Sequence, residues 1–364
     1  MLTGRKATWT LLALPLCVGL WAGAAYADER LIIGVDDDDT IGDTSGTVTV
    51  TNDDLSQFIP TNPPADYSNG TGTWSLFFDG SAIVAPNTTY QTADISTGFN
   101  SIAFLNGDLI FSVADDEFVG GTTAAFDFDP EDLIRFSPNV PGVYTPSAGT
   151  YSMFLDGSSF GGSSDDINEP IDAIEFLADG SLLLSVSAGD TIRGVAMEDD
   201  DIIKFTPTVA GAYLNGVGTW TLFLDGSSFG NDTQDINDDI DALAILPDGS
   251  LLISVGGDET IRSIAIEDED VLKFTPTVAG AYLNGVGTWT TFMIGDSFGP
   301  SSEDIDDSDL ENLAFLPHSH VQPPPNGEGP VIPEPSSMLL LGLGGMAAGL
   351  TSRRRNQHRA SLGC

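Results

Sequence analysis

Short apolar runs separated by turn residues recur along the chain. The clearest copy is residues 240–255, IDALAILPDGSLLISV, in which two apolar segments flank a Pro-Asp-Gly turn. Residues 171–186, IDAIEFLADGSLLLSV, and residues 99–113, FNSIAFLNGDLIFSV, follow the same pattern. Proline presets one backbone dihedral of such a turn and glycine takes the left-handed one. Each copy is therefore predicted to form a β-hairpin.

A constant interval of 69 residues relates the later copies. Trp220 and Trp289 are one interval apart, and so are Tyr151 and Trp220. Such periodicity indicates stacked or radial units, each too small to bury its apolar face alone. One unit is predicted to contain four strands, here called a, b, c and d. In the third copy they are residues 240–246, 251–255, 270–276 and 287–293.

The two ends of the chain hold the pieces of a fourth unit. Residues 310–316 match strand a and are followed by a linker. The matching strands b, c and d lie near the N-terminus, at residues 31–35, 54–58 and 72–78. These pieces form one complete unit only if Leu31 and Leu316 lie side by side.

We therefore predict an all-β fold: a four-bladed β-propeller of about 69-residue, four-stranded repeats. It is closed by N- and C-terminal strands that share one blade. The alternatives are a linear array of β-sandwich modules or a β-solenoid. A linear array would leave half-units with unpaired strand edges at both ends, which proteins usually avoid. The propeller is expected to occupy residues 28–317.

The N-terminus has the pattern of a signal peptide at residues 1–27. Arg5 and Lys6 precede an apolar run over residues 9–23, and Ala25-Tyr26-Ala27 provides a small-residue cleavage site. This pattern predicts passage through the Sec export machinery. The alternative is a retained membrane anchor, for which the apolar run is short.

The C-terminus combines three features in a fixed order. After a proline-rich linker at residues 318–332 come Pro333, Glu334 and Pro335, then an apolar run over residues 338–350. The run is followed by the basic cluster Arg353, Arg354 and Arg355, and by a basic and polar tail at residues 356–364. Thirteen apolar residues are short for a bilayer span of about 20. Hydropathy alone therefore leaves a chance C-terminal anchor open, with the arginines on the cytoplasmic side.

Residues 333–355 resemble the PEP-CTERM sorting signal of Gram-negative bacteria, in which a Pro-Glu-Pro motif precedes a short transmembrane helix and a basic tail. The resemblance implies transient anchoring in the inner membrane, recognition by an exosortase and cleavage near the motif. It also implies delivery to the cell envelope, the cell surface or an extracellular matrix, with exopolysaccharide as a partner there.

The net charge of the chain limits the classes of molecule that it can bind. The net charge is −42, and all 54 acidic residues lie between Asp28 and Glu334, where only six of the 12 basic residues lie. Such a body repels a phosphate backbone, so nucleic acid is excluded, while cations are attracted. The only cysteines, Cys17 and Cys364, lie in the terminal segments, so the body is expected to have no disulfide.

The loops between the predicted strands are rich in carboxylate and amide oxygens, which suggests a Ca²⁺ site. If strand a is innermost, the acidic d-to-a and b-to-c loops share one face, and four equivalent residues at the start of strand a surround the central channel. The axial candidates are Asn100, Asp172, Asp241 and Glu311, and the loop candidates are Asp166, Asp235 and Asp304. The alternatives are that the acidic loops only keep a secreted protein solvated, and that the axial side chains bond to neighbouring loops.

Two other repeated sets are predicted to be structural. One acidic residue opens strand c in every unit and is expected to make a repeated hydrogen bond. These residues are Asp54, Asp132, Asp201 and Asp270. An aromatic residue in strand d is expected to pack the blade rather than to bind sugar. These residues are Trp74, Tyr151, Trp220 and Trp289.

The body offers little for catalysis. His318, His320 and His358 follow the last predicted strand, so neither a histidine base nor a cysteine nucleophile is available in the body. The sequence predicts a non-enzymatic structural or binding protein. A secreted polysaccharide hydrolase with a carboxylate pair and an adhesin for a glycan or protein are the alternatives.

Overall fold

The computed structural model describes part of the chain. The described residues are 30–36, 38–43, 46–61, 67, 72–83, 95–120, 125–162, 165–229, 234–297, 305 and 310–316. The chain divides into two units, Met1–His320 and Val321–Cys364, and all described residues belong to the first. The predicted signal peptide, linker, sorting signal and tail lie outside the described residues.

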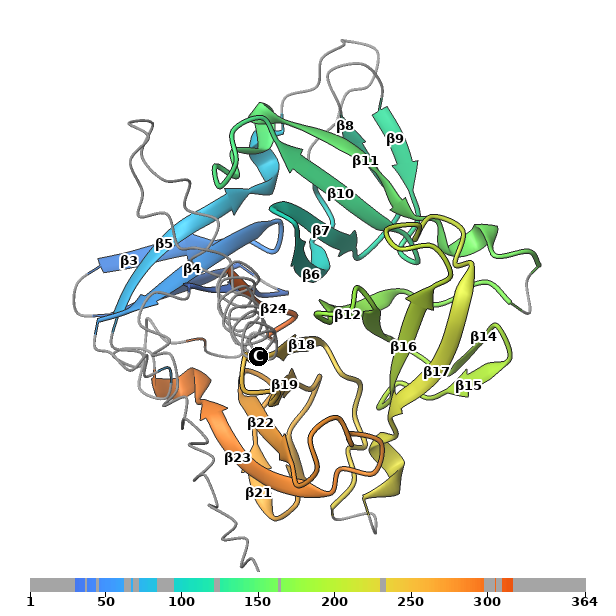
Figure 1. Ribbon diagram of the computed structural model, residues 1–364. Coiled ribbons are helices and arrows are strands. Elements are labelled where there is room, and N and C mark those ends of the chain that lie inside the picture. The colour runs from blue at the N-terminus through green and yellow to red at the C-terminus, as the bar shows by residue number, and fades with distance from the viewer. Residues whose placement is uncertain are drawn as a thin grey trace, which may run out of the picture. The chain divides into compact units, whose positions relative to one another are not determined.

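Four four-stranded antiparallel sheets are arranged around a common axis (Figure 1). From the inside outward, blade 1 contains β24 (Asn312–Leu316), β1 (Arg30–Gly34), β4 (Asp54–Pro60) and β5 (Gly72–Asp79). Blade 2 contains β6 (Phe99–Leu105), β7 (Asp108–Val113), β10 (Leu133–Pro138) and β11 (Gly149–Leu155). Blade 3 contains β12 (Ile171–Phe176), β13 (Leu182–Val186), β16 (Ile202–Pro207) and β17 (Gly218–Leu224). Blade 4 contains β18 (Ala242–Ile245), β19 (Leu251–Ser254), β22 (Val271–Pro276) and β23 (Gly287–Met293).

The four-bladed propeller and its closure are confirmed. Strands β6, β12, β18 and β24 contact one another around the axis, so strand a of each unit is innermost. The C-terminal β24 pairs with the N-terminal β1, with Leu31 opposite Phe315 and Arg30 opposite Leu316. Blade 1 is thus completed by the two ends of the body, as the split repeat predicts.

Each b-to-c connection also contains a two-stranded ribbon that the sequence analysis read as loop. The ribbons are β2 (Asp39–Asp43) with β3 (Gly46–Val50), β8 (Glu117–Gly120) with β9 (Ala125–Phe128), β14 (Asp190–Ile192) with β15 (Val195–Met197), and β20 (Glu259–Ile261) with β21 (Ile264–Ile266). The last two ribbons turn through residue pairs with positive φ, Arg193-Gly194 and Arg262-Ser263. Hairpin turns of this type are usually marked by Asn-Gly or Asp-Gly, so these sequences gave little signal.

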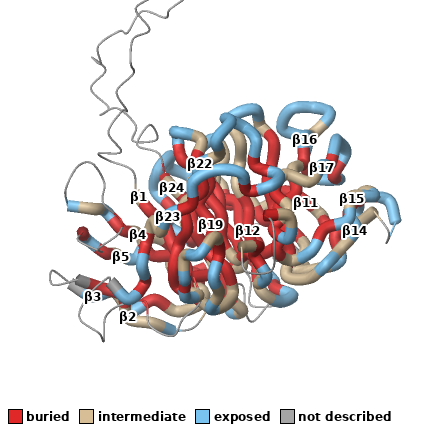
Figure 2. The backbone as a smooth tube through the Cα atoms, turned by 90° about the horizontal axis from the view of Figure 1, so that it is seen from below, coloured by how far each residue is buried: buried red, intermediate tan, exposed pale blue. Residues whose placement is uncertain are grey.

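The apolar core lies between adjacent blades. Each of four buried clusters combines side chains of two neighbouring blades; Leu31 of β1, for example, belongs to the cluster that contains Leu252 of β19 and Leu313 of β24. Figure 2 shows buried positions running through the strands and exposed ones gathered in the connections. Because no blade buries its faces alone, the four sheets stabilise one another.

The strand d aromatics pack inside their blades, which confirms their predicted structural role. Trp220 stacks on Phe205 with ring centroids 4.5 Å apart, and its Nε1 donates to the Gly216 carbonyl at 3.0 Å. Trp289 repeats both contacts in blade 4. All four strand d aromatics are at most 8% exposed, so they offer no platform to a sugar.

A second aromatic contact joins each blade to the next. Tyr282, in the c-to-d loop of blade 4, stacks on Phe223 of β17 at 4.4 Å and donates its hydroxyl to the Gly249 carbonyl at 2.8 Å. The equivalent pairs are Phe154 with Tyr213, Phe77 with Tyr144, and Phe292 with Tyr67. The last pair joins blade 4 to blade 1 and adds to the closure of the ring.

Candidate functional site

The acidity of the propeller is concentrated on one face. The d-to-a and b-to-c connections meet there, since Asn168 N donates to Asp190 Oδ2 at 2.9 Å and Asn237 N donates to Glu259 Oε2 at 3.1 Å. This confirms the shared face that the sequence predicts, and we call it the acidic face.

The opposite side carries the a-to-b turns and the c-to-d loops. Residues 139–148, 208–217 and 277–286 of these loops contain no charged residue. Asp108, Asp179 and Asp248 of the turns pair with Arg135, Lys204 and Lys273 at 3.5, 2.9 and 2.9 Å. Charge on this side is therefore largely balanced.

The axial candidates lie at the starts of the innermost strands. Asn100 Nδ2 of β6 donates to Asp172 Oδ1 of β12 at 3.2 Å, across the boundary between blades 2 and 3. Both residues sit where the pairing of strand a with strand b shifts by one residue. Such a bulge can turn a side chain away from its usual direction. The structure thus brings Asn100 and Asp172 into direct contact.

Negative charge surrounds Asp172. Burial, and then the charges of Asp239, Glu311 and Asp199, raise its pKa to about 8. Burial, and then the charge of Asp199, also raises the pKa of Asp239. The influence of Glu311 on Asp172 places these two candidates at the same end of the channel.

Asp241, the remaining axial candidate, lies beside Asp239. A Cβ atom added to Gly256 would lie 2.5 Å from Asp239 Oδ1 and 3.0 Å from Asp241 Oδ2, so both carboxylates crowd the same backbone. Asp239 was not predicted from the sequence. Its spacing of two residues before Asp241 was the available signal.

Glu175 is a second residue that was not predicted from the sequence. It lies further along β12, where the other inner strands have Ala103, Ala244 and Ala314. Its Oε2 accepts a hydrogen bond from Ile245 N at 3.3 Å and so links the inner strands of blades 3 and 4. Burial raises the pKa of Glu175 to about 7. The sequence signal for this residue was a glutamate at a repeat position where the other three units have alanine.

The loop candidates do not come together. Asp166 Oδ1 accepts from Gly161 N at 3.1 Å in an exposed turn, and this bond orders the turn locally. Asp235 occupies the equivalent place one unit later and is buried, at 7% exposed. Asp304 lies outside the described residues. Because Asp166 and Asp235 belong to different d-to-a loops, they do not form one site.

The predicted hydrogen bond of the strand c aspartates is confirmed. Asp201 Oδ2 accepts from Glu198 N at 2.9 Å and its Oδ1 accepts from Gly226 N at 3.1 Å, which ties the b-to-c turn to the start of the d-to-a loop. Asp132 and Asp270 make the same pair of bonds. Asp54 makes only the turn half, with Thr51.

A second acidic cluster occurs only in blade 4 among the described residues. Carboxylate oxygens of Glu267, Glu269 and Asp296 lie within 4.8 Å of one another. In blade 3, Ser227 stands at the position of Asp296 and donates to Asp225 Oδ1 at 3.0 Å. Burial, and then a hydrogen bond with Asp268, raises the pKa of Glu269 to about 9. These three carboxylates lie close enough to share a proton or to hold a cation.

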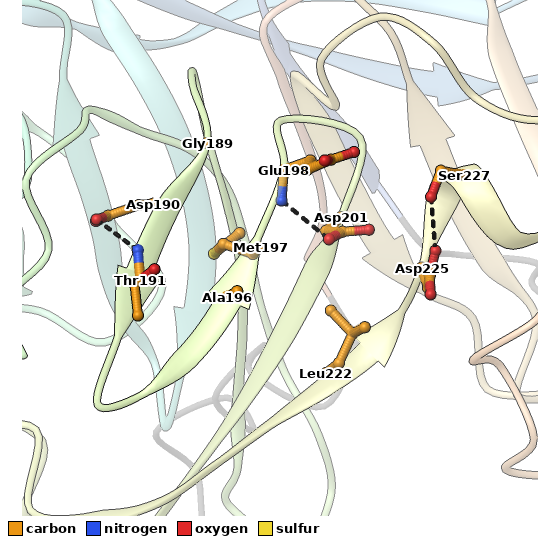
Figure 3. A pocket seen from close by; sticks show the side chains of 10 residues that line it. All are labelled: Gly189, Asp190, Thr191, Ala196, Met197, Glu198, Asp201, Leu222, Asp225 and Ser227. Atoms are coloured by element: carbon orange, nitrogen blue, oxygen red, sulfur yellow. Dashed lines mark hydrogen bonds between the residues drawn. The ribbon is translucent and has the colours of Figure 1, made fainter.

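An open pocket of about 690 Å³ lies on the acidic face of blade 3 (Figure 3). It is lined by both strands of the β14–β15 ribbon, by the b-to-c turn and by the start of the d-to-a loop. The lining carboxylates are Asp190, Glu198, Asp201 and Asp225, accompanied by the hydroxyls of Thr191 and Ser227. Carboxylates accept hydrogen bonds and hydroxyls both donate and accept, so the pocket suits a polyhydroxyl or cationic ligand.

The described part of the chain contains no histidine and no cysteine. No helix within that part is long and apolar enough to span a membrane. The predicted transmembrane segment, at residues 338–350, lies outside it.

Residues 331–355 match the model of the PEP-CTERM protein-sorting motif. The match confirms the sorting motif seen in the sequence, with Pro333, Glu334, Pro335 and the arginines 353–355 inside it. This motif implies export, processing by an exosortase and sorting to the cell surface. The comparison with curated protein sequences gave no match.

Several solved structures are similar to the chain at low identity. YCF48 bound to D1 peptide is 12% identical over 74% of this chain and 68% of that chain, with a TM-score of 0.24. YCF48 from Cyanidioschyzon merolae is 10% identical over 72% of this chain and 56% of that chain, with a TM-score of 0.27. A virginiamycin B lyase from Staphylococcus aureus is 10% identical over 76% and 73% of the two chains, with a TM-score of 0.29. Scores this low carry no functional argument, and the propeller rests on the pairing of its own strands.

Proposed function

We propose that this protein is a non-enzymatic binding module of the cell surface or its extracellular matrix, and that its acidic face binds matrix polysaccharide. The PEP-CTERM motif supports the location. The open pocket of blade 3 supports the proposal of binding, because it presents four carboxylates and two hydroxyls.

The test is a glycan array probed with the purified full chain. We expect retention of neutral or cationic polysaccharides, and a loss of retention in Glu198→Gln and Asp225→Asn. Asp179→Asn is the matched control, since Asp179 pairs with Lys204 on the opposite side. Retention that is absent, or equal in all three variants, contradicts binding through this pocket.

One observation favours a second candidate, a polysaccharide hydrolase. Asp200 adjoins the pocket residue Asp201, and burial raises the pKa of Asp200 to about 7, so it can donate a proton near neutral pH. Glycoside hydrolases use a carboxyl with a raised pKa as the general acid and a second carboxylate as the base or nucleophile. Release of reducing ends from a retained polysaccharide, abolished by Asp200→Asn, would replace the binding proposal with this one.

Sorting is tested separately. Replacing Pro333, Glu334 and Pro335 by alanine is expected to leave the protein in the cell-membrane fraction, because the motif that the exosortase recognises is lost. A variant that reaches the cell surface as efficiently as the native chain would show that this motif does not direct its sorting.

A further inference from the structure

The side of the ring opposite the acidic face exposes a group of apolar side chains, and we call it the apolar side. Its c-to-d loops in blades 2, 3 and 4 contain no charged residue. Valines at equivalent positions of these loops are 54–66% exposed: Val140, Val209 and Val278 near the start of the loop, and Val217 and Val286 at its end. Single exposed apolar residues are ordinary, but a group of them on one side marks an interaction surface.

A tight turn displays the first valine of each loop. In blade 3 the Ala212 N–H donates to the Val209 carbonyl at 2.9 Å, and Gly211 between them takes a positive φ of 80°. Blades 2 and 4 repeat this turn. Because the turn is closed by its own hydrogen bond, the valine loses little conformational freedom when it contacts a partner.

The two ends of the body leave the ring on the apolar side. Tyr213 of the c-to-d loop donates its hydroxyl to the carbonyl of Gly180 in the a-to-b turn at 2.8 Å, so loop and turn share this side, and Tyr282 repeats the contact in blade 4. In blade 1 the pairing of Arg30 with Leu316 stands where the other blades have the a-to-b turn. The chain therefore enters β1 and leaves β24 on the apolar side.

The sequence after Leu316 indicates the partner of this side. The PEP-CTERM motif begins at residue 331 and contains the apolar run at residues 338–350 and the arginines 353–355. An apolar run with a basic flank favours insertion into a membrane. With a net charge of −42 the chain is repelled by anionic lipids, except where its surface is uncharged or its charges are paired, as they are on the apolar side.

We propose that the apolar side rests on the lipid bilayer while the C-terminal segment holds the chain there, with the turn valines of blades 2, 3 and 4 inserted among the lipids. The contact needs little affinity of its own, because the tether keeps the body at a high effective concentration near the bilayer. The acidic face and its pocket then point away from the membrane. This inference does not depend on the ligand proposed for the pocket.

A fluorescent reporter in proteoliposomes tests the proposal. In the full chain with Cys17→Ser and Cys364→Ser, Val278→Cys provides the single attachment site for an environment-sensitive dye. The vesicles contain phosphatidylethanolamine and phosphatidylglycerol, with and without brominated acyl chains, which quench a dye that they contact. We expect a blue-shifted emission that brominated lipid quenches. Ala265→Cys is the matched control, because Ala265 is exposed in β21 on the acidic face of the same blade, and we expect neither effect there.

A second pair of variants tests whether the valines make the contact. Val209→Asp, added to the Val278→Cys reporter chain, is expected to abolish the quenching at residue 278, because a carboxylate in the turn opposes insertion among lipids. Ala196→Asp adds the same charge at an exposed position on the acidic face of blade 3 and is expected to leave the quenching unchanged. High salt is expected to preserve the quenching, since it screens the repulsion between the acidic body and phosphatidylglycerol.

Three results would overturn the proposal. The first is equal quenching at residues 278 and 265, or none at either. The second is a blue shift at residue 278 that brominated lipid does not quench and that grows with the number of chains per vesicle, which would assign the apolar side to a second copy of the chain. The third is undiminished quenching in Val209→Asp, which would show that the turn valines do not contact lipid.

Discussion

The closure of the ring makes Leu313 as important to stability as a residue in a continuous blade. Leu313 lies in β24 at 1% exposed, within the buried cluster between blades 4 and 1. Leu243 occupies the equivalent place in β18, also at 1% exposed, within the cluster between blades 3 and 4. Truncation of a buried leucine to alanine costs about 2–5 kcal/mol, of a total stability of about 5–15 kcal/mol. We expect Leu313→Ala and Leu243→Ala each to lower the free energy of unfolding by this amount.

Equilibrium unfolding in urea measures both costs, with the fluorescence of the blade tryptophans as the signal. The midpoint is expected to fall in each variant while the m-value stays unchanged, because the same surface is exposed on unfolding. A strand that merely lay along the surface would behave like an exposed site, where substitutions change stability by about 0.5 kcal/mol or less. A change of that size for Leu313→Ala, beside a full cost for Leu243→Ala, would refute the closed ring.

Three further outcomes follow from the packing and the buried carboxyls. Tyr282→Phe removes the hydrogen bond to the Gly249 carbonyl and should lower the free energy of unfolding by about 0.5–1.5 kcal/mol. Tyr282→Leu also loses the stack on Phe223 and should lower it further. Urea unfolding that ranks the two variants in the reverse order contradicts the aromatic contact between the blades. Gly226→Ala would place its Cβ 2.3 Å from the Asp200 carbonyl oxygen and should destabilise the fold by more than about 2 kcal/mol. Gly189→Ala is the control and should be tolerated, because the nearest atom to its Cβ would be 3.5 Å away. Equal melting temperatures for the two variants would show that the contact at Gly226 is not tight. Burial raises the pKa of Asp132, Glu175 and Asp200 to about 7. The folded chain therefore keeps protons that the unfolded chain releases near pH 4. The free energy of unfolding should fall as the pH rises from about 4 to 7. Glu175→Gln should flatten this dependence, and an unchanged slope would show that Glu175 does not keep its proton.

The sequence contained most of the information about the fold, because the ring repeats one unit and any position can be compared with its counterparts. The interval between Trp220 and Trp289 locates strand d in two blades, and the half-units at the two ends leave a closed ring as the arrangement with paired edges. The β14–β15 and β20–β21 ribbons were missed because their three-residue strands are too short to show a period, and because their turns use Arg193 and Arg262 in place of asparagine or aspartate.

The candidate site was predicted only in part. The equivalence of Asn100 and Asp172 was visible as a repeat position, and their contact follows from the ring. Asp239 lies two residues before Asp241, and Glu175 departs from alanine in a single blade, but neither was predicted. The role of such a residue can be judged only when the strands have been placed around the axis, because only then are its neighbours in the other blades known.

The pairing of β1 with β24 also determines when blade 1 can form as the chain is synthesised. Strand β1 emerges among the first residues of the body and β24 among the last, so β1 keeps a free edge until nearly the whole body has been synthesised. The loop-closure cost of so long a separation grows only with the logarithm of its length, but pairs this distant in sequence form late. Blade 1 therefore cannot be completed before β24 has been made, even if blades 2, 3 and 4 have already formed. The pairing that closes the finished ring is thus the last to become available to the growing chain.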